Sequence, residues 1–193
     1  IYNECVKAGS PDLPIIFTST SKITFPGAGV AVEAASPNNV ALLKGRMKYQ
    51  TIGPDKLNQL RHARMFRTVE DIEKHMKRHA AILRPKFETV EKELQNQLSG
   101  TGIARWTTPR GGYFISLYVL EGCAKRVEQL CANAGMILTP AGATYPYGND
   151  PKDSNIRIAP SYPSVEEIEK ASEVLALAVR YAALEKLLAD KEN

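Results

Sequence analysis

Residues 19–29 have the sequence Ser-Thr-Ser-Lys-Ile-Thr-Phe-Pro-Gly-Ala-Gly, in which Lys22 follows hydroxyl-bearing residues and precedes a Pro-Gly turn. The apolar runs 14–17 and 30–35 on either side predict two short strands, the first of them buried. Lys22 therefore falls at a strand end, where α/β sheets place ligand chemistry. Because the charged form of a lysine is costly in a buried position, Lys22 can supply a neutral amine, which is a nucleophile. The alternative is a surface lysine that keeps its ammonium group in water.

Arg157 is the second residue whose position suggests chemistry. It lies between Ile156 and Ile158 in a predicted strand of period two, so its side chain faces away from both isoleucines. A guanidinium group presents its donors in a rigid fork, which suits bidentate binding of a carboxylate. The same pattern also fits an arginine that simply faces solvent.

The histidine and cysteine patterns favour structural roles. His75 and His79 are four residues apart on a predicted helix, which is the spacing of a metal pair, but no HExxH pattern or third ligand accompanies them. We therefore expect a solvated helix face. Cys5, Cys123 and Cys131 are an odd number without CxxC spacing, so we expect reduced and chemically inert thiols.

The charge balance argues against some partners. The 193 residues include 25 Lys and Arg against 21 Asp and Glu, giving a net charge of +4 without any run of five like charges. The sequence lacks the basic stripe that nucleic-acid binding requires, and no apolar run approaches the length of a membrane span. With the free cysteines, these features favour a cytoplasmic protein that binds neither nucleic acid nor a membrane.

Three helices are predicted to follow the strand pair. Ser36 caps the first, residues 53–55 separate it from the second, and Thr68 with Asp71 forms a capping box at the start of the third. The third helix has apolar residues at gaps of three and four over many turns, which predicts one buried face. Pro85 lies inside this run and predicts a kink or a break.

From residue 102 onward, shorter elements alternate. The patterns predict strands over 103–107, 112–119, 136–138 and 155–159, a helix over 122–134, and a final helix capped by Ser164 and Glu167. This order is typical of an α+β domain in which helices cover one sheet.

The segment around Lys22 resembles the cofactor-lysine segment of fold-type I pyridoxal-phosphate (PLP) enzymes, Ser-x-Ser-Lys followed by a Pro-Gly or Gly-rich turn. Further segments resemble the aspartate-aminotransferase-like branch, sometimes grouped with MocR-type or "alanine–glyoxylate" aminotransferases. These segments are 51–56, 111–116, 139–143 and 155–161. The resemblance covers essentially the whole chain, and it implies an α/β fold, namely the C-terminal portion of a fold-type I PLP-dependent transferase.

The resemblance implies a role for each candidate residue. Lys22 would hold PLP as a Schiff base and would then move protons as a general base and acid. Ser19 would bind the cofactor phosphate, and Ser21 would share that role or only hold the turn. Arg157 would bind the substrate α-carboxylate.

Two positions qualify this assignment. Many fold-type I aminotransferases have a phosphate-binding arginine seven or eight residues after the lysine, where this chain has Gly29 and Val30. Backbone N–H groups of residues 27–29 could approach the phosphate instead, although a plain tight turn fits equally well. The aromatic residues Tyr113 and Phe114 belong to a family segment near the substrate, and we expect them to be core residues.

The implied activity is that of a PLP-dependent aminotransferase, which moves an amino group from an amino acid to a 2-oxo acid by ping-pong chemistry. Aspartate, glutamate or alanine would be the donor and 2-oxoglutarate the acceptor. Such enzymes are homodimers, and their remaining site residues precede the lysine segment, so we expect a C-terminal fragment of a protein about twice as long. One alternative is the PLP-binding, effector-sensing domain of a MocR-type transcription regulator. Another is a structural α/β domain without a cofactor.

The resemblance also predicts domain limits. Residues 1–67 would be the C-terminal end of the large PLP-binding domain, residues 68–101 a connecting helix, and residues 102–193 the small α+β domain.

Overall fold

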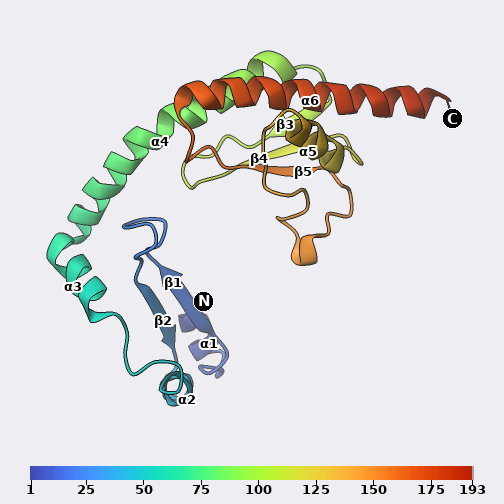
Figure 1. The fold of residues 1–193 in the computed structure, drawn as a ribbon. Helices are drawn as coiled ribbons and strands as arrows, with labels where there is room; N and C mark the ends of the chain where they lie inside the picture. Colours follow the sequence, from blue (N-terminus) through green and yellow to red (C-terminus); the bar gives the residue numbers. More distant parts are fainter. Residues whose placement is uncertain (193) are drawn as a thin grey trace. The chain divides into compact units, whose positions relative to one another are not determined.

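The computed structural model describes residues 1–192, which form two compact units that divide between Ala80 and Ala81. The first unit contains α1 (Tyr2–Lys7), β1 (Ile15–Ser19), β2 (Ala31–Ala35), α2 (Pro37–Met47), α3 (Lys56–Met65) and the start of α4 (Val69–Leu98) (Figure 1). The second contains the rest of α4, β3 (Ala104–Trp106), β4 (Ile115–Val119), α5 (Ala124–Asn133), the 3-10 turn η1 (Pro146–Gly148), β5 (Asn155–Ile158) and α6 (Val165–Glu192).

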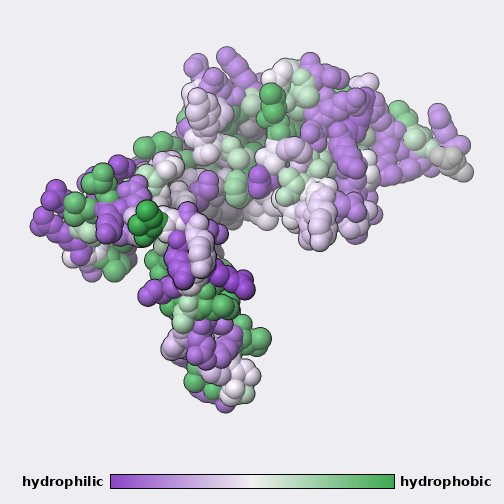
Figure 2. Space-filling model, turned by 60° about the horizontal axis from the view of Figure 1, so that its bottom comes forward, coloured by the Kyte–Doolittle hydropathy of each residue, from purple (hydrophilic) through white to green (hydrophobic). Residues whose placement is uncertain are grey.

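The first unit is built on an antiparallel hairpin of β1 and β2, in which Ile15 lies opposite Ala35 and Ser19 opposite Ala31. The expectation that the first strand is buried is wrong, because every residue of β1 is exposed. Periodicity indicates a strand but not how many neighbours it has, and this sheet has two strands within the described chain. Apolar side chains therefore lie at the surface of this unit, where Figure 2 shows them in green.

The helix starts of the first unit follow the predicted capping chemistry. Ser36 Oγ accepts the Asn39 N–H at 3.3 Å at the start of α2. The Thr68 N–H donates to Asp71 Oδ2 at 3.2 Å and the Asp71 N–H donates back to Thr68 Oγ1 at 3.4 Å, so the capping box before α4 is confirmed. These bonds satisfy N–H groups that have no partner inside the helix.

Helix α4 continues through Pro85, so the predicted break is absent, and the alternative of a kink stays a prediction. The buried face explains its continuity, since Val90, Leu94 and Leu98 are buried in the core of the second unit and hold the helix after the proline in place. Tertiary packing thus outweighs the local cost of the proline.

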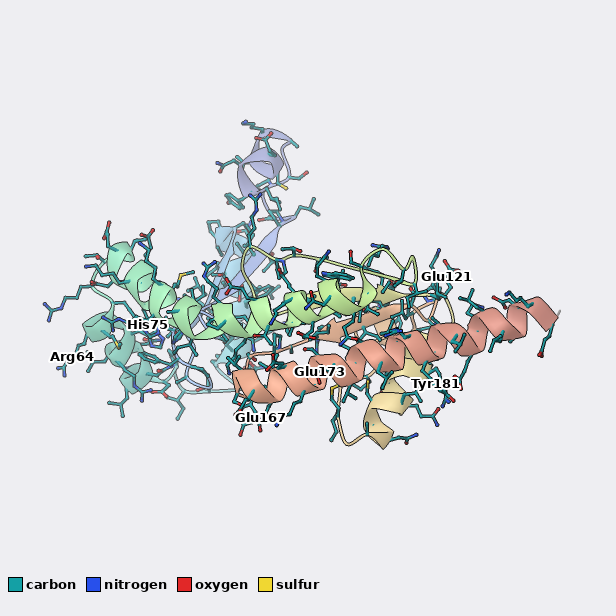
Figure 3. All side chains as sticks on the ribbon, turned by 90° about the horizontal axis from the view of Figure 1, so that it is seen from above. Arg64, His75, Glu121, Glu167, Glu173 and Tyr181 are labelled. Carbon is teal, nitrogen blue, oxygen red and sulfur yellow. The ribbon has the colours of Figure 1, made fainter. Side chains whose placement is uncertain are left out.

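The second unit is an antiparallel sheet of order β3-β4-β5 covered by helices, as the sequence predicts. Ile115 lies opposite Ile158, and Leu117 opposite Ile156. These side chains join α4, α5 and α6 in one core, whose helical members include Leu94, Val127, Leu175, Val179 and Ala182. The capping box at the start of α6 is also confirmed, because Ser164 N–H donates to Glu167 Oε2 at 2.7 Å and Glu167 N–H donates to Ser164 Oγ at 3.2 Å. Figure 3 labels Glu167 at this end of α6.

The predicted strand over residues 136–138 is absent from the structure. Gly135 has φ +84°, and the Met136 N–H donates to Cys131 O at 2.9 Å, so these residues close the end of α5 instead. Met136 and Leu138 pack against the core, while Ile137 is exposed. The side chains thus alternate between core and solvent as the sequence predicts, but the segment pairs with no strand of the described chain.

None of the helices in the described part of the chain is long and apolar enough to cross a membrane.

Replacing Leu94 with alanine tests the core of the second unit. Leu94 is fully buried, so Leu94→Ala leaves a cavity and should lower the free energy of unfolding by about 2–5 kcal/mol. Leu177→Ala on α6 is the matched control, because Leu177 is 64% exposed and its loss should change that free energy by less than about 0.5 kcal/mol. Denaturant unfolding measures both, and equal losses would contradict this core.

Candidate functional site

Lys22 lies in the turn between β1 and β2, residues 20–30, which we call the lysine turn. The side chain is exposed, so the expectation of a buried lysine is wrong. Ser19 and Ser21 precede it with their hydroxyl oxygens 2.6 Å apart, and the Ser21 N–H donates to Ser19 Oγ at 3.1 Å. The turn thus presents two hydroxyl groups and one amine on an exposed segment.

Gly29 packs directly against the other arm of this turn. A Cβ at position 29 would lie 2.7 Å from Ser21 Oγ and 2.9 Å from both Ser21 Cα and Ser21 N. These distances are shorter than any stable contact, so position 29 accepts only glycine in this conformation. The structure therefore explains why no arginine stands there, and it brings the Gly29 backbone next to the serine pair.

Thr24 connects the lysine turn to the helices behind it. Its side chain is 2% exposed, and its hydroxyl oxygen lies 3.0 Å from Thr20 Oγ1 and 2.8 Å from His62 Nε2. Thr20 Oγ1 accepts the Val30 N–H at 2.9 Å, which ties the two arms of the turn together. Asn58, one helical turn before His62 on α3, donates from Nδ2 to Ala28 O at 2.8 Å and to Gly29 O at 3.2 Å.

His75 also contacts the lysine turn, which corrects the expected solvated helix face. His75 is half-buried, and its Nε2 lies 3.0 Å from Thr24 O. The ring of His79 lies 4.3 Å from that of His75, and burial followed by the charge of His75 lowers the pKa of His79. Sequence reasoning missed Thr24, Asn58 and His62 as well, because helical spacing does not reveal which segment lies against a helix face. A usable signal was the i, i+4 spacing of two polar residues, Asn58 and His62, on one helix.

Arg157 lies in the second unit, on the face of β5 opposite to the core. Ile156 and Ile158 are buried while Arg157 is half-buried, which agrees with the predicted alternation. The Arg157 Cζ atom lies 4.5 Å from the centre of the Phe114 ring, and its Nε is buried without a hydrogen-bond partner in the described residues. Phe114 is 44% exposed, so the expectation of a core residue is wrong. Stacking on the ring fixes the guanidinium plane and leaves its edge available to an acceptor.

A polar network stabilises the strand that carries Arg157. Asn155 is 3% exposed, its Oδ1 accepts the Thr144 hydroxyl at 2.6 Å, and its Nδ2 donates to Ser116 Oγ at 2.8 Å. Ser116 lies directly opposite Arg157 in the strand register. The backbone that presents Arg157 is therefore held by buried hydrogen bonds.

The cysteines of the second unit are core residues. Cys123 and Cys131 are both buried. Burial raises the pKa of the Cys131 thiol to about 11 and also raises the pKa of Cys123. Neither therefore forms a thiolate readily near neutral pH, as expected for inert thiols.

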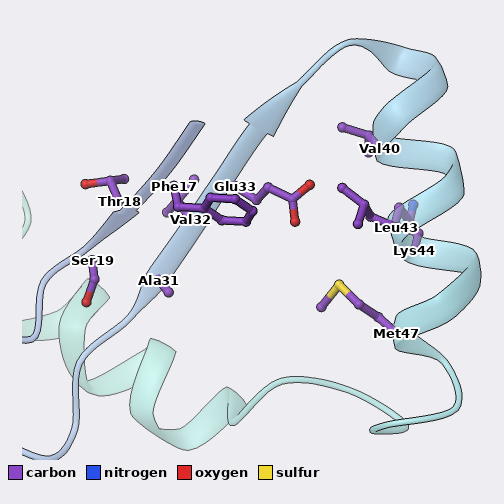
Figure 4. Close-up of a pocket in the computed structure, with 10 residues that line it drawn as sticks. All are labelled: Phe17, Thr18, Ser19, Ala31, Val32, Glu33, Val40, Leu43, Lys44 and Met47. Carbon is purple, nitrogen blue, oxygen red and sulfur yellow. The ribbon is translucent and has the colours of Figure 1, made fainter. Parts of the chain in front are cut away.

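A hollow of about 560 Å³ lies between the hairpin and α2 (Figure 4). Its walls are mostly apolar and include Phe17, Val32, Leu43 and Met47, with Ser19 at its edge. Lys22 and Ser21 do not line it. The hollow is thus an apolar surface beside the lysine turn and not a pocket that encloses the amine.

Comparison with known families identifies the class of protein. The aspartate amino-transferase family matches residues 1–191, so the chain belongs to the aspartate aminotransferase family. Its mixed α/β fold is that of part of an aminotransferase.

Individual relatives agree with this assignment. The chain is 48% identical over 178 residues to the aspartate aminotransferase of Corynebacterium glutamicum, covering 92% of this chain and 41% of that protein. The crystal structure of an aspartate transaminase from that organism superposes with a TM-score of 0.89 at 47% identity, over 94% of this chain and 43% of the other. An α-aminoadipate aminotransferase from Thermus thermophilus shares the fold, with a TM-score of 0.74 at 20% identity over 95% of this chain and 46% of the other. The chain spans less than half the length of these relatives.

Replacing Gly29 tests the geometry of the lysine turn. Because the added Cβ would overlap the backbone of Ser21, Gly29→Ala should lower the free energy of unfolding by about 1–3 kcal/mol. Hydrogen exchange of residues 20–30 should also speed up. Gly45→Ala is the control, since a Cβ there meets nothing within 4 Å, and alanine should stabilise α2 by roughly 0.5–1 kcal/mol. Unchanged exchange in Gly29→Ala would rule out the close contact.

Proposed function

We propose that this chain is part of a PLP-dependent aminotransferase in which Lys22 Nζ binds the cofactor covalently. The observation that carries the proposal is the lysine turn, where an exposed amine follows two hydroxyl groups 2.6 Å apart. The family assignment supports it, and the α-aminoadipate aminotransferase structure contains N-(5'-phosphopyridoxyl)-L-leucine. When bound, the cofactor supplies an electron sink that stabilises negative charge on the substrate carbon.

The residues of the turn fit the chemistry of a phosphorylated aldehyde. Ser19 and Ser21 offer hydroxyl donors for a phosphate, and the absence of a side chain at Gly29 leaves its backbone accessible beside them. Lys22 is exposed and can reach an aldehyde carbon. In this proposal Ser19 and Ser21 replace the arginine that many fold-type I enzymes carry at position 29 or 30. Once released by substrate, the Lys22 amine would take the proton from the substrate α-carbon and would deliver it to the cofactor carbon that had carried the aldehyde.

Arg157 is the proposed site for the α-carboxylate of both the amino acid and the 2-oxo acid. Its guanidinium is stacked on Phe114 and has a buried Nε–H without an acceptor among the described residues, which a carboxylate oxygen would provide. A charge-assisted hydrogen bond of this kind contributes about 1.5–3 kcal/mol. The stacked ring orients the fork, so the substrate meets a donor set that is already in place.

The relatives also guide the proposed substrates. The C. glutamicum relative is named an aspartate aminotransferase, which favours aspartate or glutamate, with alanine as a further donor and 2-oxoglutarate as the acceptor. A homodimer in the cytoplasm is proposed with this activity. The alternative function is effector sensing by a MocR-type regulator. Sustained conversion of an amino acid and a 2-oxo acid, without DNA, would distinguish the enzyme from the sensor.

Borohydride reduction of the PLP-loaded full-length protein tests the role of Lys22, since this chain alone is expected to be inactive. We expect peptide mass mapping to find a phosphopyridoxyl group on Lys22, and we expect Lys22→Ala to abolish both this adduct and transamination. Lys44→Ala is the control, because Lys44 lies on α2 beside the apolar hollow and should leave the adduct unchanged. An unmodified Lys22 in PLP-saturated protein, or full activity of Lys22→Ala, would refute the proposal.

Two substitutions in the second unit test the carboxylate site. Arg157→Lys removes the fork, so KM for the amino acid should rise about tenfold to a hundredfold, in line with the loss of 1.5–3 kcal/mol. Phe114→Leu removes the stacked ring and should raise KM about threefold to tenfold. Arg105→Lys is the matched control, because Arg105 also stacks on an aromatic ring, with its Cζ 4.0 Å from the Tyr118 ring centre, but is exposed. Equal steady-state kinetics for all three variants and wild type would exclude this role for Arg157.

A further inference from the structure

All three histidines of the chain gather beside the lysine turn. His62 on α3 and His75 on α4 lie around Phe25 and Phe66, and His79 lies against His75; we call these five residues the histidine cluster. The Phe25 ring centre lies 5.1 Å from that of His62 and 5.8 Å from that of His75. All five side chains are half-buried. Figure 3 labels His75 on its helix.

The polar atoms of the cluster meet at one residue of the turn. His62 Nε2 lies 2.8 Å from Thr24 Oγ1, and His75 Nε2 lies 3.0 Å from Thr24 O. Thr24 is thus held through its side chain by one helix and through its backbone by another. Its hydroxyl group also lies 3.0 Å from Thr20 Oγ1, which accepts the Val30 N–H. Lys22 lies between Thr20 and Thr24 in the chain. Hydrogen bonds therefore hold a residue on each side of Lys22.

The contacts determine where the ring protons lie. His62 Nδ1 lies 2.9 Å from Asn58 O, and since a carbonyl oxygen only accepts, this nitrogen carries the proton. His62 Nε2 lies 2.8 Å from Thr24 Oγ1, which also donates to Thr20 Oγ1 at 3.0 Å. His75 Nε2 faces the Thr24 carbonyl and must donate. Both rings therefore form polar contacts with the same threonine, which packing alone would not require.

The surroundings of the cluster include a cation on α3. The Arg61 Cζ atom lies 5.9 Å from the Phe25 ring centre. Burial, followed by the charge of His75, lowers the pKa of His79 on α4. The neutral form of His79 is therefore favoured.

We propose that His62 and His75 are positioning residues that fix the Lys22 amine through Thr24, without touching the substrate. The inference rests on the proposed role of Lys22 as the cofactor-binding lysine. The physical basis of this proposal is that a nucleophile on an exposed turn keeps a defined position only when several contacts hold the backbone on both sides of it. The histidine cluster contributes such contacts from α3 and α4. Asn58 contributes a further contact, to Ala28 O in the arm of the turn that leads into β2.

A pair of substitutions at His62 separates hydrogen bonding from packing. His62→Phe keeps the ring contacts but removes both nitrogens, whereas His62→Gln loses the ring but keeps a group that can reach Thr24. We expect His62→Phe to lower the hydrogen-exchange protection of residues 20–30 about tenfold, as the loss of one buried hydrogen bond implies. It should also slow formation of the borohydride-trapped PLP adduct in the holoprotein by a similar factor. His62→Gln should restore most of both.

A second pair of substitutions, at Thr24, tests the same contact in case the His62 variants fail to fold. Thr24→Val removes the shared hydroxyl with little change in volume, and Thr24→Ser retains it. Thr24→Val should reproduce the effects of His62→Phe, and Thr24→Ser should resemble wild type. If phenylalanine at 62 is better tolerated than glutamine, or if valine and serine at 24 behave alike, the histidines only fill space and the proposal is wrong.

The exchange measurement is made on the protein without PLP, so it does not depend on Lys22 chemistry. Lys22→Ala should abolish the trapped adduct. If wild-type protein forms no adduct on Lys22 while His62→Phe still loses protection, the proposed function fails and the stabilisation of the turn by His62 stands. If the adduct forms equally fast in all variants, the positioning role fails and the proposed function stands.

Discussion

The contact between Gly29 and the backbone of Ser21 is the constraint on which the candidate cofactor site depends. Only a residue without Cβ allows the two arms of the lysine turn to approach this closely. The approach brings the Thr20 hydroxyl within 2.9 Å of the Val30 N–H and places Thr24 against α3 and α4. It also excludes an arginine from position 29.

Different interactions stabilise the two units. The hydrophobic core of the described chain lies in the second unit, where α4, α5 and α6 pack on β4 and β5. The first unit keeps many apolar side chains at its surface, Phe17 at 71% exposure among them, and its turn is ordered by hydrogen bonds to Thr24 and Asn58. A site ordered by hydrogen bonds is sensitive to the loss of a single donor, because each unpaired buried group keeps its desolvation cost.

The second unit shows how a rigid sheet prepares a binding group. Arg157 lies on β5, which is held by buried isoleucines on one face and by the hydrogen bonds of Asn155 on the other. Phe114, just before β4, lies against the guanidinium and limits its rotation. The arginine therefore needs little reorganisation to meet an anion, which is the advantage of placing a charged fork on a strand instead of a loop.

The sequence by itself determined the features that local chemistry controls. The caps at Ser36, Thr68 and Ser164 need only neighbours three residues away, and the alternation around Arg157 is a property of any strand. The family pattern around Lys22 was likewise readable, because it lies in one continuous segment. Only the tertiary structure decided the exposure of β1, the lack of a strand at 136–138, the stacking of Phe114 and the contact of His75 with Thr24. Each of these depends on segments distant in sequence, and periodicity records the shape of a segment but not what lies against it.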